Sequence, residues 1–451
     1  MRRWMCFAAA AGALAMMAAS PARGMRHVPS AAVLLSPSPL VEWSHEARRA
    51  IVPAGPGGIF GAENYGNKFP GEAAVYMGIV HAAMYDAALA IEGGYQPYAV
   101  ALDAAAGTSP EAAIATAAHH VLVGLQPGLG LTPAQQALLD ARYAAYLAQL
   151  PDGAAKVSGV AVGGQVAATV LQLRANDGRE ANPQPGDLDP PPPGPGVWDP
   201  RPSPAVGLRM PGIRPLALES GSQFRPEGPS RLSSEDYAED FKDVAQFGRF
   251  DSEARRPDQT TAALFWTDHD LRQWNDALLR LATARGLGLV KTARMLAMAH
   301  VAGADAMIAC FDAKYKYWFW RPYQAIPAAD TDGNPATDAD AGWQPLRTTP
   351  NFPEYPSAHA CHSSAVAETL SAFFGTDRVP LSIDSRVTGT VREYARFHEV
   401  VKDVDRARVL VGFHFRNSDQ EGANLGRAVA RHVVARFNQR LPREAARARE
   451  P

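Results

Sequence analysis

The feature that most constrains the fold is the spacing of apolar residues, which recur every three or four positions over long segments. Within residues 73–91, for example, Met77, Val80 and Met84 repeat with the period of a helix. The same period marks residues 134–150, 157–173, 289–317, 361–374 and 424–437. Gly375, directly after one of these segments, is typical of a helix stop. Because no segment clearly alternates as a strand does, we expect an all-α fold.

A proline-rich segment interrupts this pattern at residues 182–215. It contains four consecutive prolines at 190–193, which a helix cannot accommodate. The segment is either a linker or a long ordered loop, and such loops inside compact domains are often functional. The chain therefore divides into a helical layer at 23–180, a crossing loop at 181–230 and a second helical part at 231–440.

The overall composition is that of a globular protein with a large core. Of the 451 residues, 47% are hydrophobic and 20% are charged, which lies outside the disordered range. The net charge of −2 gives no basic excess, so a nucleic-acid partner is not expected.

The first 22 residues resemble a secretory signal. Arg2 and Arg3 precede an apolar run at 7–19, and small residues at 20–22 provide a cleavage site. We expect a secreted or periplasmic protein; an uncleaved membrane anchor is the alternative. No later segment is expected to be long and apolar enough to cross a bilayer, which takes about 20 residues.

Cysteine usage leaves two possibilities. Cys6 belongs to the predicted signal, so the mature chain keeps Cys310 and Cys361. One disulfide is possible in an oxidising compartment, and two buried thiols are equally consistent. The spacing fits no zinc site.

Three clusters in the C-terminal half carry residues suited to oxyanion chemistry. In the first, Lys314 and Arg321 are seven positions apart, which returns to nearly the same face of a helix. Pro322 disfavours helical geometry at Arg321, so the helix is expected to end there. Arginine offers a planar fork of donors and lysine a mobile charge. The alternative is a solvated basic face at a helix end.

The second cluster is a proline-bounded turn that leads into a helix. Ser357 occupies the expected cap position, and the free amides of the first turn form an anion site. The Ser357 hydroxyl can donate to the same ion, and His359 is placed for proton transfer. An ordinary capped helix with a structural histidine explains the same pattern.

The third cluster surrounds His414. Asp419 follows it by five residues, and Arg408 and Arg416 are nearby cations. A carboxylate paired with a histidine fixes its tautomer and raises its basicity. A core histidine in an amphipathic helix is the alternative.

Together these clusters resemble the superfamily of type 2 phosphatidic acid phosphatases and vanadium-dependent haloperoxidases. Its signature is K-x6-R-P, then P-S-G-H, then S-R-x5-H-x3-D. The first part matches unbroken at Lys314 to Pro322. The second matches at 356–359, except that Ala358 replaces glycine, and the third matches from Arg408 to His414, with Ala407 replacing serine.

Two further observations qualify the resemblance. Segments 80–86, 317–320 and 352–355 look more like bacterial haloperoxidase members than small acid phosphatases. Asp419 lies one position later than the family's aspartate, so a backbone bulge, Asn417 or Ser418 could orient His414 instead.

The resemblance implies a helical bundle of the phosphatidic acid phosphatase/haloperoxidase type at 231–440, with an additional N-terminal helical layer. It implies that His414 binds vanadate, the cofactor, and that His359 and Asp419 are catalytic. The oxyanion would be held by Lys314, Arg321, Ser357, Ala358 and Arg408.

Three functions remain open at this stage. The preferred one is a haloperoxidase-like enzyme, with peroxide and halide as small-molecule substrates. The second is a phosphatase, inhibited by vanadate, in which His414 attacks a phosphate ester and His359 protonates the leaving oxygen. The third is a non-catalytic oxyanion-binding protein. A homo-oligomer is possible in each case.

Overall fold

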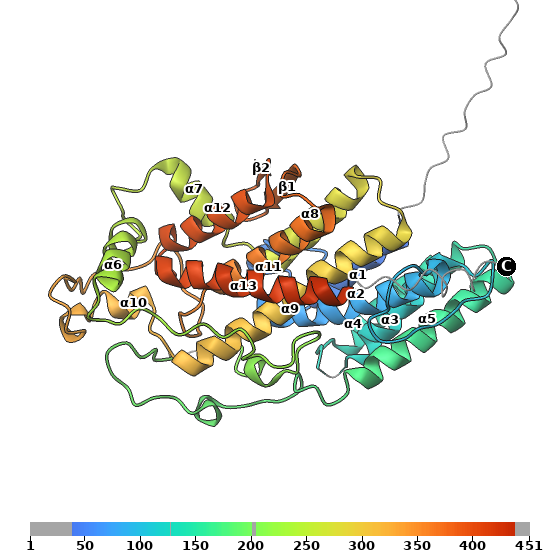
Figure 1. The fold of residues 1–451 in the computed structure, drawn as a ribbon, viewed down its shortest axis with the longest axis horizontal. Helices are drawn as coiled ribbons and strands as arrows, with labels where there is room; N and C mark the ends of the chain where they lie inside the picture. Colours follow the sequence, from blue (N-terminus) through green and yellow to red (C-terminus); the bar gives the residue numbers. More distant parts are fainter. Residues whose placement is uncertain (1–37, 127, 201–203, 438–451) are drawn as a thin grey trace, which may run out of the picture. The chain divides into compact units, whose positions relative to one another are not determined.

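Two long helices, α2 (Pro70–Glu92) and α9 (Leu289–Tyr317), lie side by side at the centre of the described chain (Figure 1). The computed structural model describes residues 38–126, 128–200 and 204–437. These described residues form one compact unit. The predicted signal at 1–22 lies outside the described residues.

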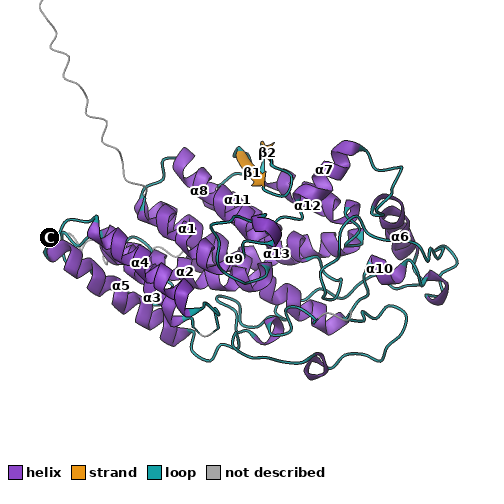
Figure 2. Ribbon diagram, turned by 180° about the vertical axis from the view of Figure 1, so that it is seen from behind, coloured by secondary structure: helices purple, strands orange, loops and turns teal. Residues whose placement is uncertain are grey.

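Thirteen α-helices account for most of the described chain (Figure 2). Besides α2 and α9 they are α1 (Pro39–Ile51), α3 (Pro110–Gly124), α4 (Pro133–Ala148), α5 (Ala154–Leu173), α6 (Glu235–Phe247), α7 (Pro257–Phe265), α8 (Asp270–Ala284), α10 (Pro322–Ala325), α11 (Ala358–Phe374), α12 (Phe397–Leu410) and α13 (Arg416–Phe437). Four 3₁₀ helices are at Pro56–Gly58, Pro185–Leu188, Met210–Gly212 and Ala329–Thr331. The expected all-α class is confirmed.

Local sequence explains where many of these helices begin and end. Proline occupies the start of α1, α2, α3, α4, α7 and α10, where its missing N–H costs no helical bond. Ser109 caps α3 by accepting from the amide of Ala112. Gly375 ends α11 with φ +70°, as its position predicted.

Close packing of α2 on α9 depends on a glycine. A Cβ at Gly78 would lie 2.8 Å from a Leu216 methyl and 3.0 Å from the Cβ of Ala304. Gly78 therefore lets the N-terminal layer approach α9 directly. The core is continuous across both parts of the chain, because residues of α2, α3, α9 and α11 belong to one apolar cluster.

One short antiparallel hairpin departs from the expectation that no segment forms a strand. Strands β1 (Leu381–Ser385) and β2 (Thr390–Tyr394) pair with Leu381 opposite Tyr394. Alternate residues of β1 are buried, which is the period-2 pattern of a half-buried strand. Five residues are too few for this alternation to stand out in the sequence.

The proline-rich crossing is an ordered loop over its described residues. The Asp305 carboxylate on α9 accepts the amides of residues 216–218 at 2.6–2.9 Å. The amide of Trp198 donates to the carbonyl of Trp318, and that of Val206 donates to the carbonyl of Asn351. These bonds attach the crossing to segments that build the site described below.

Three of the described helices have the length and apolar composition of a membrane span, contrary to the expectation that none would. They are α2, α5 and α9. The apolar windows of α2 and α9 are 94% buried inside the protein, and that of α5 is 28% buried. The central position of α2 and α9 in the core accounts for their composition.

Candidate active site

Helix α9 carries Lys314 to the site, and the extended segment after it carries Arg321. Helix α9 ends at Tyr317, because Trp318 is left-handed with φ 51°. The expectation that the helix continues to Arg321 is therefore wrong. Arg321 is extended, with φ −87° and ψ 158°, as the following proline requires.

The Arg321 guanidinium is buried and reaches His414. Its Nε donates to the carbonyl of Phe352 at 2.9 Å, and its Nη1 donates to the carbonyl of Phe413 at 3.0 Å. Nη1 also lies 3.0 Å from Nε2 of His414. Because arginine nitrogens only donate, His414 Nε2 is the acceptor, and its lone pair receives the hydrogen bond from Arg321.

A hydrogen bond at the other ring nitrogen of His414 fixes this tautomer. Nδ1 of His414 lies 2.8 Å from Oε1 of Glu354, to which it donates. Glu354 is fully buried and also accepts from the amide of Phe415 and the hydroxyl of Ser418. Burial raises the pKa of Glu354 to about 7, and the Arg321 charge opposes this shift. Glu354 is thus the carboxylate that orients His414.

Asp419 does not occupy the orienting position that the sequence suggested. Helix α12 ends at Leu410, the chain turns at Gly412 with φ +80°, and α13 begins after His414. His414 and Asp419 therefore do not share a helix, and helical spacing does not relate them. Burial, followed by the neighbouring Asp405 carboxylate, raises the pKa of Asp419 well above its usual range.

Ser418 and Asn417 are the two alternatives to Asp419, and Ser418 helps to orient His414 only indirectly, through Glu354. Its hydroxyl binds Glu354, and its carbonyl accepts the amide of Ser357 at 2.9 Å. Asn417 donates its amide to Asp240 instead. Glu354 was missed because its role depends on this folding of the 350–357 segment against the 413–418 segment.

Lys314 holds the turn that carries Glu354. Its ammonium group donates to the carbonyls of Pro353 and Glu354 at 3.1 and 2.8 Å, and to the carbonyl of Pro356. These three bonds use all three ammonium hydrogens. Burial lowers the pKa of Lys314 to about 8. Lys314 can therefore act on an oxyanion by its charge, or directly after releasing one carbonyl.

The start of α11 presents unused polar groups. Ser357 is the N-cap, as predicted, yet its hydroxyl makes no cap bond. Among the described residues it also has no hydrogen bond of ordinary geometry, although it lies close enough to Asp419 to lower that pKa. Ala358 follows it, and its methyl group faces a cavity. The helix dipole favours an anion at this end.

Arg408 and His359 complete the polar group. Arg408 donates through Nη1 to the carbonyl of Trp266 at 2.7 Å, while its Nε lacks a hydrogen bond within the described chain. The same holds for Nε2 of His359. Burial lowers the pKa of Arg408 to about 10. Burial, and then the Arg408 charge, lower the pKa of His359 to about 3.

A second buried carboxylate, Asp270, lies near His359. Its Oδ2 is 3.0 Å from Nδ1 of His362, and both side chains are buried. Burial alone would raise the pKa of Asp270, but its interactions with His362 and His359 hold it well below its usual range. Neither Asp270 nor His362 carried a sequence signal, because α8 and α11 meet only in the fold.

Some of these groups line a cavity of about 230 Å³. Its polar lining includes His359, Arg408 and His414. The rest is mainly apolar: Phe69, Pro70, Gly71, Val206, Met307, Phe311, Pro350, Asn351, Phe352 and Ala358. The start of α2 and the proline-rich crossing therefore build a wall of the site.

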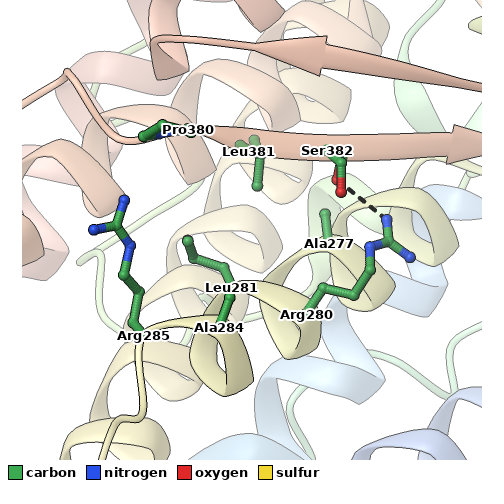
Figure 3. A pocket seen from close by; sticks show the side chains of 8 residues that line it. All are labelled: Ala277, Arg280, Leu281, Ala284, Arg285, Pro380, Leu381 and Ser382. Carbon is green, nitrogen blue, oxygen red and sulfur yellow. Dashed lines mark hydrogen bonds between the residues drawn. The ribbon is translucent and has the colours of Figure 1, made fainter. Parts of the chain in front are cut away.

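Another hollow, of about 290 Å³, lies between α8 and β1 (Figure 3). Arg280, on its wall, donates to the carbonyl of Ser382 and pairs with Asp384. The Asp384 carboxylate therefore compensates the charge of Arg280. Cys310 and Cys361 are both buried free thiols, which settles the choice left open by the sequence.

Comparison with known proteins agrees with this architecture. Residues 294–442 match the sequence model of the VCPO second helical-bundle domain. A bacterial vanadium-dependent iodoperoxidase superposes with a TM-score of 0.71 and 21% identity, covering 90% of this chain and 98% of that one. No curated protein sequence matches the chain.

Two structures of bacterial vanadium-dependent chloroperoxidase are also similar. The holo form has a TM-score of 0.65 and 16% identity over 86% of this chain and 95% of that one. The apo form has a TM-score of 0.62 and 15% identity over 82% and 94%. The chain is therefore vanadium haloperoxidase-like in fold, with residues 294–442 matching the second helical bundle of that fold.

Proposed function

We propose that this protein is an exported, vanadium-dependent haloperoxidase-like enzyme that oxidises halide with hydrogen peroxide. The observation that carries the proposal is the state of His414. Glu354 fixes its tautomer, so that the lone pair of Nε2 lies beside Arg321 at the polar end of a cavity. A neutral, oriented imidazole of this kind is suited to bind a metal centre.

The surrounding residues fit a bound vanadate. Arg408 Nε lacks a hydrogen-bond partner among the described residues, and the Ser357 hydroxyl makes no cap bond and lies beside the Asp419 carboxyl. An unused buried donor favours an anionic ligand. Lys314, Arg321 and Arg408 supply three positive charges. Vanadate would be bound through Nε2 of His414, with Arg408, Ser357 and the first amides of α11 as donors to its oxygens.

The residues that line the cavity provide proton transfer and restrict the access of water. Bound vanadate would supply activation of peroxide toward halide. The low pKa of His359 keeps its ring neutral at neutral pH, and its Nε2, which has no hydrogen bond within the described chain, lines the cavity as the group placed for proton transfer with peroxide. The apolar walls restrict water and strengthen the field of the cations.

The test compares three histidine variants. His414→Ala should abolish vanadate binding measured by calorimetry, and with it vanadate-dependent halogenation of a phenolic dye. His359→Ala should retain binding and lose about 10²–10⁴-fold in turnover, as for a lost proton-transfer group. His398→Ala is the control, since this half-exposed histidine pairs with Asp377 away from the site.

Other outcomes would favour the other functions. Phosphate-ester hydrolysis as the only activity, inhibited by vanadate, would contradict the proposal and support a phosphatase. Tight phosphate binding with neither activity would support a non-catalytic oxyanion-binding protein. Retained vanadate binding in His414→Ala would remove His414 from the role of ligand.

Export forms a separate part of the proposal. The support is the charged start, apolar run and small-residue site within residues 1–22. N-terminal sequencing of protein from the producing cell should find a chain that begins near Arg23 outside the cytoplasm. An intact Met1 on cytoplasmic protein would contradict it.

A further inference from the structure

We propose that Cys310 and Cys361 form a peroxide-sensitive redox pair, which closes to a disulfide between α9 and α11 and reopens on reduction. Both thiols are free and fully buried, and the mechanism proposed above uses neither. The disulfide can be formed and detected without vanadate. Only the source of the oxidant in the cell rests on the proposed function, in which hydrogen peroxide is a substrate.

The two thiols meet where α9 packs against α11. The side chains of Cys310 and Cys361 are hydrogen-bonded to each other. The Cys310 thiol also donates to the carbonyl of Pro356 at 3.5 Å, and the Lys314 ammonium group binds the same carbonyl. The pair therefore lies directly beside the 353–356 turn, with the two sulfur atoms in contact.

The pair is covered by α13 on one side and lies close to the cavity on the other. A Cβ at Gly422 would lie 3.3 Å from the amide nitrogen of Cys361, and one at Gly426 would lie 2.2 Å from its carbonyl oxygen. Met307 of α9 and Ala358 of α11 line the cavity. Each precedes a cysteine of the pair by three residues, which is nearly one helical turn. The cavity therefore brings hydrogen peroxide, which is little larger than water, within about one helical turn of both cysteines.

The surroundings make the two thiols unequal. Burial alone would raise the pKa of Cys310, but the hydrogen bond from Cys361 and two nearby cations hold this pKa below its usual value. The cations are Lys314 and Arg321. Burial and the hydrogen bond to Cys310 raise the pKa of Cys361 well above its usual range. Because the thiolate is the nucleophile in cysteine chemistry, Cys310 attacks peroxide and Cys361 resolves the product.

The oxidation balances with one molecule of peroxide. The Cys310 thiolate attacks one peroxide oxygen, the oxygen–oxygen bond breaks, and the leaving hydroxide takes up the proton that Cys310 released, which gives water and a sulfenic acid. The Cys361 sulfur then attacks the Cys310 sulfur, the sulfur–oxygen bond breaks, and a second water leaves with the Cys361 proton. Two thiols lose two hydrogens, and peroxide is reduced to two waters.

The disulfide joins the two helices that carry the anion site. Helix α9 carries Lys314, and α11 begins directly after Ser357. A cross-link between residues that are distant in the chain stabilises the folded state chiefly by restricting the unfolded one. Oxidised protein should therefore unfold at a higher temperature than reduced protein.

The experiment treats vanadate-free protein with hydrogen peroxide and then alkylates the remaining thiols in denaturant. Mass spectrometry of the intact chain and of a non-reducing digest identifies the product. Wild type should lose two hydrogens, yield peptides joined through Cys310 and Cys361, and revert with dithiothreitol. Both thiols remaining open to alkylation, or a bridge to a different cysteine, would overturn the inference.

Two single variants separate the roles of the thiols. Cys361→Ser keeps a hydroxyl donor but removes the resolving thiol, so a sulfenic acid should accumulate at Cys310 and be trapped by dimedone. Cys310→Ser leaves only the thiol of raised pKa, which should react with peroxide at least tenfold more slowly. Equal rates, or faster reaction of Cys310→Ser, would overturn the assignment of Cys310 as the nucleophile.

Thermal unfolding of wild type guards against variants that fail to fold. The oxidised protein should unfold several degrees above the reduced protein. An equal or lower unfolding temperature would overturn the role of the bond as a cross-link between α9 and α11. Vanadate-dependent halogenation is assayed separately, and its absence in protein that still forms the disulfide would contradict the proposed function alone.

Discussion

Two charge clusters of the described chain differ in how their cations are compensated. The first, which we call the α8 cluster, contains Arg48, Arg272, Arg280, Asp268, Asp276 and Asp384. Arg272 donates to Asp268 and Asp384 at 2.8 Å and to Asp276 at 3.2 Å. Burial alone would lower the pKa of Arg272, but these carboxylates raise it above its usual range.

The cations at the site donate to backbone carbonyls instead. Lys314 binds three carbonyls of the 353–356 turn, and Arg408 binds that of Trp266. Burial lowers the pKa of both groups. The nearby Glu354 carboxyl has a raised pKa, so it compensates the positive charge only partly near neutral pH.

The difference separates a structural role from a binding role. In the α8 cluster, three arginines face three aspartates, and the fold supplies the compensating charge. At the site, burial lowers the pKa of Lys314 and Arg408 despite the nearby carboxylates, which is consistent with the anionic ligand proposed above. Strongly perturbed pKa values in a cavity are typical of functional sites.

The sharpest test removes one cation from each cluster. Arg272→Met leaves buried carboxylates uncompensated and should lower the free energy of unfolding by about 3–5 kcal/mol. Arg408→Met removes a buried cation whose Nε has no hydrogen bond within the described chain, so it should lower the free energy of unfolding by less than Arg272→Met does. Urea denaturation measures both. Equal losses would show that Arg408 also stabilises the fold.

Glu354 offers a test through pH. Its folded pKa of about 7 exceeds the ordinary value of 4.5, so between these values the folded state keeps a proton that the unfolded state releases. The free energy of unfolding should therefore fall by about 3 kcal/mol as pH rises from 4.5 to 7. Relative to wild type, Glu354→Gln should lack this fall. Parallel pH curves for the two proteins would contradict the assignment.

A ligand should stabilise only the protein with an intact site. Orthovanadate at 100 times its Kd should raise the free energy of unfolding of wild type by about 2.7 kcal/mol. Arg408→Met should gain much less at the same concentration. Arg280→Met, from the α8 cluster, is the control and should gain as much as wild type. A full gain in Arg408→Met would place the anion elsewhere.

The smallest expected effect comes from replacing arginine with lysine, which keeps the positive charge and changes the geometry of the hydrogen-bond donors. Arg321→Lys and Arg408→Lys should each weaken orthovanadate binding by about 1.5–3 kcal/mol, because an ammonium cannot reproduce the guanidinium fork. Arg280→Lys should leave the affinity unchanged. Calorimetry provides the measurement, and unchanged affinity in both site variants would place these arginines outside the site.

Apolar spacing predicted six of the helices, α2, α4, α5, α9, α11 and α13, and the motifs gave the order of the three clusters. The bounds of α9 and the stop at Gly375 follow from apolar spacing and glycine chemistry, which act between near neighbours. The three clusters could be recognised because each is short and continuous. In the fold, Lys314, Arg321 and His414 do meet around the 350–357 segment.

Only the tertiary structure decided which carboxylate meets His414. Glu354 lies sixty residues before His414, and the turn at Gly412 removes Asp419 from helical register with it. The same is true of the cavity wall, where Phe69 and Val206 come from the N-terminal layer and the crossing. Local periodicity reports which face of an element is buried. It does not report which distant segment is packed against that face, and the chemistry of the site depends on that packing.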